Sequence, residues 1–141
     1  MSGSHKTSVL VVDDQKEIRD LFLNTLDPAE FLCETVETGR EALTRLMKRS
    51  YDVVFLDLIL PDLDGETILM LIQRHRPNVH TVIISVQDDE GVINEMMAMG
   101  AKAYLVKPFQ AEDILDIVRN VEHHQTVYEI PDASWEVPPA T

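Results

Sequence analysis

Two short apolar runs, each ending at aspartate, constrain the fold more than any other feature of this sequence. Leu10–Val12 precedes Asp13 and Asp14, and Val53–Leu56 precedes Asp57. Runs this short and this rich in Val and Leu are typical of strands buried on both faces of a parallel sheet. Because open α/β sheets form their ligand sites at the carboxyl ends of the strands, we expect the three aspartates to meet there.

Three carboxylates at one edge of a sheet repel one another unless a cation lies between them. No basic residue stands directly beside these aspartates in the sequence. A divalent metal ion is therefore the simplest explanation for the cluster, with one of the acids left free for chemistry.

Apolar periodicity predicts five strands that alternate with five helices. We expect the strands at 8–12, 31–36, 52–57, 79–85 and 103–106, and the helices at 15–26, 39–49, after 65 to about 76, 88–99 and 111–124. Gly100 should end the fourth helix in a left-handed conformation. With right-handed crossovers, five βα units give an α/β fold: a doubly wound, five-stranded parallel sheet with helices on both faces.

The length of 141 residues fits one domain, which we expect at 8–124. Residues 1–7 are predicted to be a flexible start. Residues 125–141 are predicted to be an acidic, Pro-rich tail or the stub of a linker, because apolar periodicity ends there.

Composition excludes several classes of partner. The chain has 12 basic and 25 acidic residues, a net charge of −13, which argues against direct binding of nucleic acid or of an anionic membrane. Its single cysteine excludes an intrachain disulfide and a cysteine-based metal site. No apolar stretch is long enough for a membrane span or a signal peptide, so we expect a cytoplasmic protein.

Further polar residues stand at the predicted strand ends. Ser85 ends the fourth strand, Lys107 follows the fifth, and Tyr104 lies within the fifth. Pro61 and Gly65 shape the loop after the third strand. Because parallel strands end at the same edge, the serine and the lysine are expected near the acid cluster.

In this order, these residues resemble the receiver domain of two-component response regulators, whose fold is that of the bacterial chemotaxis response regulator. The resemblance runs from about 8 to 124. It rests on the acidic pair 13–14, the Asp57…Pro61…Gly65 loop, Ser85 and the run 100–109, which reads Gly-Ala-Lys-Ala-Tyr-Leu-Val-Lys-Pro-Phe. It implies the flavodoxin-like strand order 2-1-3-4-5.

The resemblance also implies the chemistry. Asp57 would be the phosphoacceptor, which takes a phosphoryl group from a phosphohistidine of a histidine kinase or phosphotransfer protein. Mg²⁺ would be held by Asp13, Asp14, Asp57 and the backbone carbonyl of Ile59. Lys107 would contact a phosphoryl oxygen.

A switch is implied as well. The Ser85 hydroxyl would move towards the aspartyl phosphate, and Tyr104 would rotate inward with it. The surface of the fourth helix, fifth strand and fifth helix would then repack for a downstream protein target or for an output domain of the same protein. Phosphorylation could also lead to a dimer that forms through this surface. The resemblance implies that the chain would not be an ordinary enzyme: it would catalyse its own phosphorylation and its slow dephosphorylation.

Two departures from the family's pattern matter. Val86 stands where the family usually has a very small residue, which would narrow access to the phosphoryl group. Ile59 and Gln87 lie where side chains flank the path of the hydrolytic water. We hypothesise that the apolar side chain of Ile59 slows autodephosphorylation.

The sequence is also compatible with three alternative interpretations. The chain could be the receiver module of a longer transcriptional regulator or of a hybrid kinase. It could also be a degenerate receiver that acts as a phosphorylation-independent scaffold, although the intact acidic pair, Asp57 and Lys107 argue against this. A phosphatase of the haloacid-dehalogenase type also uses an aspartate at a strand end, but normally has a second aspartate where this chain has Ile59.

Overall fold

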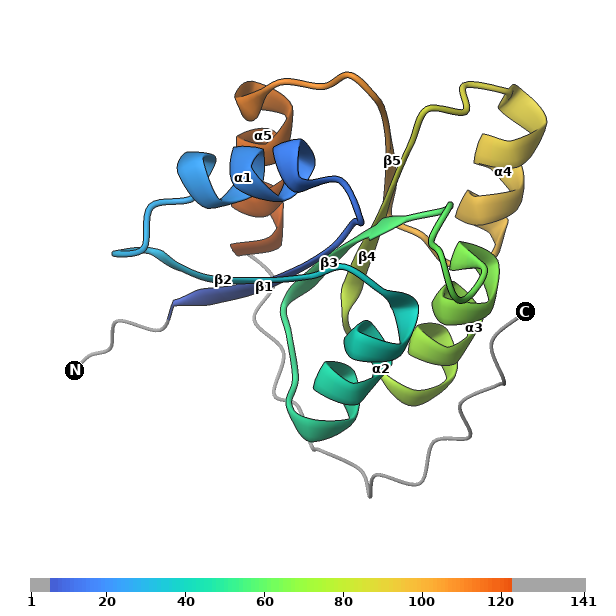
Figure 1. Cartoon of the computed structure of the whole chain (residues 1–141), viewed down its shortest axis with the longest axis horizontal. Helices are drawn as coiled ribbons and strands as arrows, with labels where there is room; N and C mark the ends of the chain where they lie inside the picture. Colours follow the sequence, from blue (N-terminus) through green and yellow to red (C-terminus); the bar gives the residue numbers. More distant parts are fainter. Residues whose placement is uncertain (1–5, 123–141) are drawn as a thin grey trace.

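The computed structural model describes residues 6–122, in which five strands alternate with five helices (Figure 1). None of the described helices is both long enough and apolar enough to cross a membrane. The elements are β1 (Thr7–Val12), α1 (Lys16–Thr25), β2 (Phe31–Val36), α2 (Gly39–Lys48), β3 (Val53–Asp57), α3 (Gly65–His75), β4 (His80–Ser85), α4 (Glu90–Ala98), β5 (Ala103–Val106) and α5 (Ala111–Glu122).

The expected elements are all present, with small differences at their ends. β1 begins at Thr7, inside the segment 1–7 that was expected to be flexible. α4 begins at Glu90 rather than at 88, because the Asp89 side chain accepts the N–H groups of Gly91 and Val92 and caps the helix there. Residues 1–5, the predicted end of the last helix at 123–124 and the predicted tail 125–141 lie outside the described residues.

The five strands form one parallel sheet in the order β2-β1-β3-β4-β5, which confirms the predicted fold class. The pairing near the carboxyl ends of the strands fixes which residues lie side by side at that edge. Val12 of β1 pairs with Leu56 of β3, Asp57 pairs with Ile84 of β4, and Ser85 pairs with Val106 of β5.

Each face of the sheet carries its own apolar core, as expected for strands buried on both sides. α1 and α5 cover one face, while α2, α3 and α4 cover the other (Figure 1). Alternation along the strands divides the apolar side chains between the cores, so that Val11 and Phe55 pack towards α1 and α5, whereas Leu10 and Leu56 pack towards the other layer. The sheet is therefore fixed from both sides, and its carboxyl edge is a rigid base for a site.

Specific residues fix the start of α2 and the end of α4. Thr38 caps α2 by accepting the N–H of Glu41 through its hydroxyl at 3.1 Å. Gly100 follows α4 with φ of +111°, which confirms the predicted left-handed cap. A side chain at this glycine would also lie 2.6 Å from Gln73 of α3, so both backbone and space require glycine.

Candidate functional site

The register of the sheet brings the predicted groups together at its carboxyl edge. Asp13 is one residue beyond β1, Asp57 ends β3, Ser85 ends β4 and Lys107 is one residue beyond β5. Because these strands are hydrogen-bonded in the order β1-β3-β4-β5, the four residues follow one another across the edge. Residues separated by up to about 90 positions in the sequence thus meet at one site on this edge.

The acid cluster consists of Asp13, Asp14 and Asp57. One carboxylate oxygen from each lies within 4.8 Å of the others. Asp13 is fully buried and Asp57 is 5% exposed, whereas Asp14 is exposed. The cluster therefore has two acids at its base and one at its rim.

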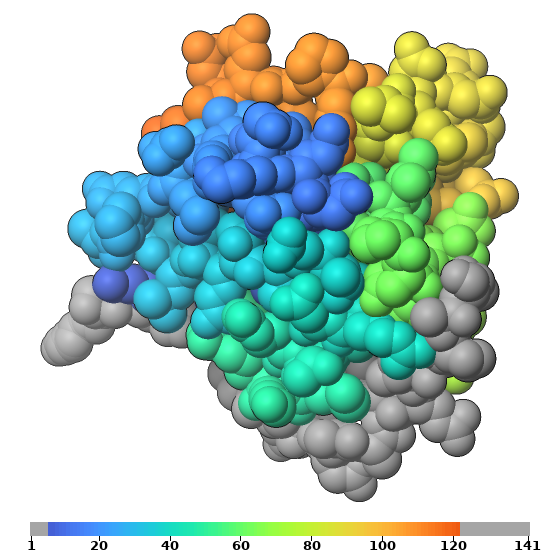
Figure 2. Space-filling view, viewed as in Figure 1, coloured from blue at the N-terminus to red at the C-terminus, as the bar shows by residue number. Residues whose placement is uncertain are grey.

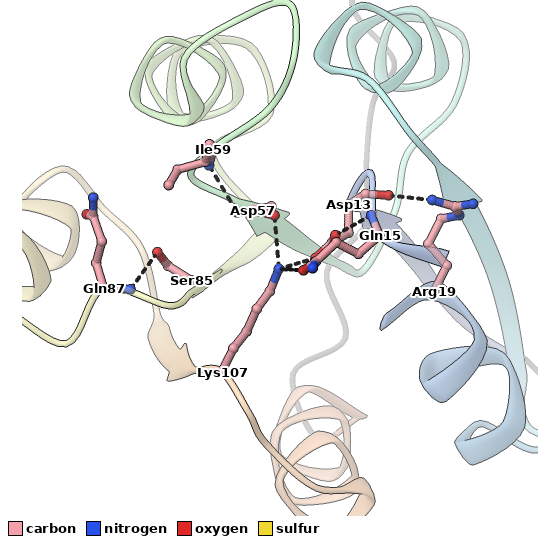
Figure 3. A network of polar contacts seen from close by, with 8 residues as sticks. All are labelled: Asp13, Gln15, Arg19, Asp57, Ile59, Ser85, Gln87 and Lys107. Atoms are coloured by element: carbon pink, nitrogen blue, oxygen red, sulfur yellow. Dashed lines mark hydrogen bonds and ion pairs between the residues drawn. The ribbon is translucent and has the colours of Figure 1, made fainter. Parts of the chain in front are cut away.

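Lys107, which its place after the fifth strand predicted to lie near these acids, contacts two of them directly. Its Nζ atom lies 2.9 Å from Asp13 Oδ2 and 3.1 Å from Asp57 Oδ2, and it donates to Gln15 Oε1 at 2.7 Å (Figure 3). The lysine side chain is only 8% exposed. The contacts with Asp57 and Gln15 are hydrogen bonds, and the contact with Asp13 is an ion pair.

Burial governs the protonation of this group of residues. Burial raises the pKa of Asp57, and the charge of Asp13 adds to this effect, although the Ile59 N–H and Lys107 oppose it. For Lys107, burial by itself lowers the pKa, but Asp13 and Asp57 outweigh it and the pKa is raised. The lysine is therefore held as a cation beside a carboxylate that is poorly solvated.

The donor set fits a hard divalent cation. All three acidic side chains offer oxygen, the ligand that Mg²⁺ prefers. The buried Oδ2 atom of Asp13 meets no hydrogen-bond donor in good geometry among the described residues, and its charged neighbour is Lys107. One lysine against three carboxylates also leaves the cluster negative, which favours a further cation.

The loop between β3 and α3 brings Ile59 to the rim of the pocket. Its N–H donates to Asp57 Oδ1 at 3.0 Å, which orients the carboxylate (Figure 3). The side chain is 57% exposed and makes the rim apolar. On the neighbouring loop Val86 is 64% exposed, so a second apolar side chain stands beside the site.

Ser85 and Tyr104 are joined through the backbone of Gln87. The hydroxyl of Ser85, which is buried, accepts the N–H of Gln87 at 3.1 Å. The Tyr104 hydroxyl donates to the carbonyl of the same residue at 2.8 Å. The ring of Tyr104 is half-buried against the α2–α3 side of the core. The loop after β4 thus links the end of β4 to β5.

Gln15 and Arg19 are members of the site that sequence reasoning missed. The N–H of Gln15 donates to Asp13 Oδ1 at 2.8 Å, and Arg19 donates to the Asp13 carbonyl at 3.0 Å (Figure 3). The only signal for Gln15 was its place directly after the acidic pair. Its contact with Lys107, 92 residues away, has no local signature in the sequence.

Comparison with known proteins agrees with this arrangement. The sequence matches the family described as "Response regulator receiver domain" over residues 9–119. It is 32% identical to the DNA-binding transcriptional regulator NtrC of Salmonella typhimurium over 83% of this chain and 25% of that protein. It is 30% identical to the chemotaxis protein CheY of Listeria monocytogenes over 77% of this chain and 92% of that protein. The chain therefore spans a quarter of the first relative but nearly all of the second.

Solved structures show the same architecture. A BeF3-activated DrrB receiver domain superimposes with a TM-score of 0.78 at 28% sequence identity, covering 85% of this chain and all of that one. The chemotaxis protein CheY4 of Vibrio cholerae has a TM-score of 0.76 at 29% identity and covers 83% of this chain and 99% of its own.

Proposed function

The chain belongs to the response regulator receiver domain family, and from this we propose that Asp57 is its phosphoacceptor. Phosphotransfer is the general function of the family. The observation that carries the proposal is the position of Asp57: it lies beside two further acids and within 3.1 Å of the buried ammonium group of Lys107.

In the proposed reaction, a carboxylate oxygen of Asp57 forms a bond to phosphorus. The phosphorus–nitrogen bond of a phosphohistidine breaks at the same time, and its electron pair returns to the imidazole. The raised pKa of Asp57 is consistent with a carboxylate that is poorly solvated and therefore more reactive. Lys107 would release one of its present acceptors and donate to a phosphoryl oxygen.

We assign the metal ligands to Asp13, Asp14, Asp57 and the backbone carbonyl of Ile59. The close approach of the three carboxylates supports the acidic part of this set. Bound Mg²⁺ would offset the charge of the acids and of the incoming phosphoryl group.

We assign the switch to Ser85 and Tyr104. If the serine hydroxyl turns towards a phosphoryl group on Asp57, it loses its hydrogen bond with the N–H of Gln87. The carbonyl of Gln87 accepts the hydroxyl of Tyr104. Phosphorylation of Asp57 would then alter the position of Tyr104 on β5 through Gln87. The related DrrB receiver domain is described as BeF3-activated, and we infer that this pocket also accepts such a phosphoryl analogue.

The partners that we propose follow from this chemistry. The donor is a histidine kinase or a phosphotransfer protein. The output is read from the α4-β5-α5 surface, where all four residues of β5 are partly exposed and Met97 of α4 is 41% exposed. Its reader would be a downstream protein, a second copy of the chain, or an output domain, since NtrC is about four times the length matched here.

Intact mass spectrometry after incubation with acetyl phosphate or phosphoramidate tests the function. The wild type should gain one phosphoryl group with Mg²⁺ and none with EDTA, and Asp57→Asn should gain none under either condition. A scaffold that does not use phosphorylation would gain no mass while still binding Mg²⁺, and a gain on Asp57→Asn would place the acceptor elsewhere. Analytical ultracentrifugation with and without beryllofluoride then tests for the dimer.

A further inference from the structure

We propose that Asp62, which is not one of the clustered acids, is a positioning residue for the metal site. It ties the β3–α3 loop to the N-terminus of α2 and so holds the Ile59 carbonyl at the pocket. The inference rests on the proposed function, because it takes that carbonyl as a ligand of Mg²⁺.

Asp62 uses both of its carboxylate oxygens on the backbone of another element. Its Oδ1 atom accepts the N–H of Gly39 at 2.8 Å, and its Oδ2 atom accepts the N–H of Arg40 at 2.9 Å. These are the first two N–H groups of α2, and Thr38 accepts the next two through its hydroxyl and its carbonyl. The N–H groups of Gly39, Arg40 and Glu41 have no acceptor within the helix, so side chains satisfy all three, and two of the three depend on Asp62.

The loop lies tightly against this end of α2. A Cβ atom on Gly39 would lie 2.6 Å from Ile68 Cδ1, 3.1 Å from Leu63 Cβ and 3.3 Å from Asp62 Oδ1. The Ile68 atom is the end of a flexible side chain, but the Leu63 and Asp62 atoms of the loop would also have to move by a few tenths of an ångström. In the space-filling view the surface of α2 directly borders that of the green β3–α3 region (Figure 2). The contact therefore has a steric part as well as a polar one.

Within the loop, the path from Asp62 to Ile59 is short and cross-linked. Ile59 forms an isolated antiparallel bridge with Asp64, and the N–H of Gly65 donates to the Leu58 carbonyl at 3.0 Å. A Cβ atom on Gly65 would lie 2.6 Å from Leu58 Cα, so the two ends of the loop touch. A displacement at Asp62 would consequently move the backbone of Ile59.

Asp64 offers a matched comparison. It lies in the same loop and precedes α3, but its side chain is exposed and makes no capping hydrogen bond. Removing it takes away one negative charge near the pocket without untying the loop. Comparing variants of Asp62 and Asp64 therefore separates the positioning of the loop from the effect of losing one negative charge.

Isothermal titration calorimetry with Mg²⁺ and, separately, with Ca²⁺ tests the inference on the wild type, Asp62→Ala, Asp62→Asn and Asp64→Ala. Mg²⁺ requires near-ideal octahedral geometry, whereas Ca²⁺ tolerates irregular ligands. We expect Asp62→Ala to weaken Mg²⁺ binding about tenfold, as for other residues that orient metal ligands. Its Ca²⁺ affinity should fall much less, so the preference for Mg²⁺ over Ca²⁺ should decrease.

The other variants decide the interpretation. Asp64→Ala should keep the wild-type ratio of the two affinities. Asp62→Asn, which retains one acceptor oxygen, should be intermediate and serves if Asp62→Ala does not fold. Equal ratios in all variants would overturn the positioning role while leaving the proposed function intact. A wild type that binds no Mg²⁺ would instead overturn the proposed metal site, and this inference with it.

Discussion

At the scale of single residues, Lys107 has the widest effect, because its one ammonium group is the counter-charge shared by two buried acids. The Asp13 side chain is fully buried and that of Asp57 is 7% exposed, so neither carboxylate can rely on water for its charge. Lys107 thus supplies part of the positive charge that the clustered acids led us to expect from a metal ion.

Replacing Lys107 by methionine should therefore destabilise the protein by about 3 kcal/mol in EDTA, because two buried carboxylates lose their counter-charge. Saturating Mg²⁺ should recover more stability for this variant than for the wild type. Urea denaturation measures both effects. Lys102→Met, which removes an exposed lysine near β5, is the control and should change stability by less than about 0.5 kcal/mol. An equal gain in stability for the wild type and the variant would show that the lysine and the metal ion do not compensate the same carboxylates.

Ile59 gives a second prediction at this scale. Its exposed side chain at the rim cannot orient a water molecule by hydrogen bonding. Ile59→Asn should shorten the lifetime of phospho-Asp57 by about fivefold, which corresponds to one hydrogen bond of about 1 kcal/mol in the transition state. The time course of phosphate release measures this lifetime, with Ile59→Val as the apolar control. An unchanged lifetime in Ile59→Asn would refute the hypothesis.

At the scale of elements, β2 is an edge strand that an ionic network ties to α2. Glu34 of β2 pairs with Arg45 at 2.9 Å and with Arg49 at 2.7 Å, and it accepts the hydroxyl of the buried Tyr51. Arg49 also lies over the Tyr51 ring, 5.0 Å from its centre. The network is remote from the acid cluster and serves the fold.

The pH dependence of this network can be predicted. Burial by itself would raise the pKa of Glu34, but Tyr51, Arg49 and Arg45 outweigh it and the pKa is lowered. Its contribution is then present above the unfolded pKa of about 4.3 and is lost as the pH falls through the folded value. Glu34→Gln should cost about 2 kcal/mol at pH 7 and almost nothing well below pH 4. Denaturation across this range measures the difference, and the exposed Glu30→Gln should show no such change. A cost independent of pH would exclude the ionic origin.

Elements were also the scale at which the sequence predicted most. β2 and β5 lie where their apolar patterns placed them, and the acids meet because parallel strands end together. β3 begins at Val53, one residue later than predicted, although the backbone of Asp52 is still hydrogen-bonded to Ser8 and His80. The contacts of Gln15 with Lys107 and of Asp62 with α2 could not be predicted, because they depend on how distant loops approach one another.

At the scale of the whole molecule, a net charge of −13 sets the background against which any cation binds. Wild-type protein should gain about 1.4 kcal/mol of stability when the free Mg²⁺ concentration is ten times its Kd. Thermal denaturation with MgCl2, compared with KCl at equal ionic strength, separates specific binding from general screening. Asp14→Asn should lose most of the specific part. Identical curves in the two salts would mean that Mg²⁺ acts only through screening.

The register of the sheet has a consequence for how this chain tolerates insertions and deletions. Asp57, Ser85 and Lys107 are placed by ladder hydrogen bonds between strands, at a spacing that loop length does not alter. Side chains alternate between faces, so one residue inserted within β3 would turn Asp57 from the pocket into a helical layer. One residue inserted between α3 and β4 would leave the pocket unchanged. The position of the reactive groups therefore depends on whether each lies an odd or an even number of residues along its strand. Insertions and deletions are expected only in the loops at the opposite edge of the sheet.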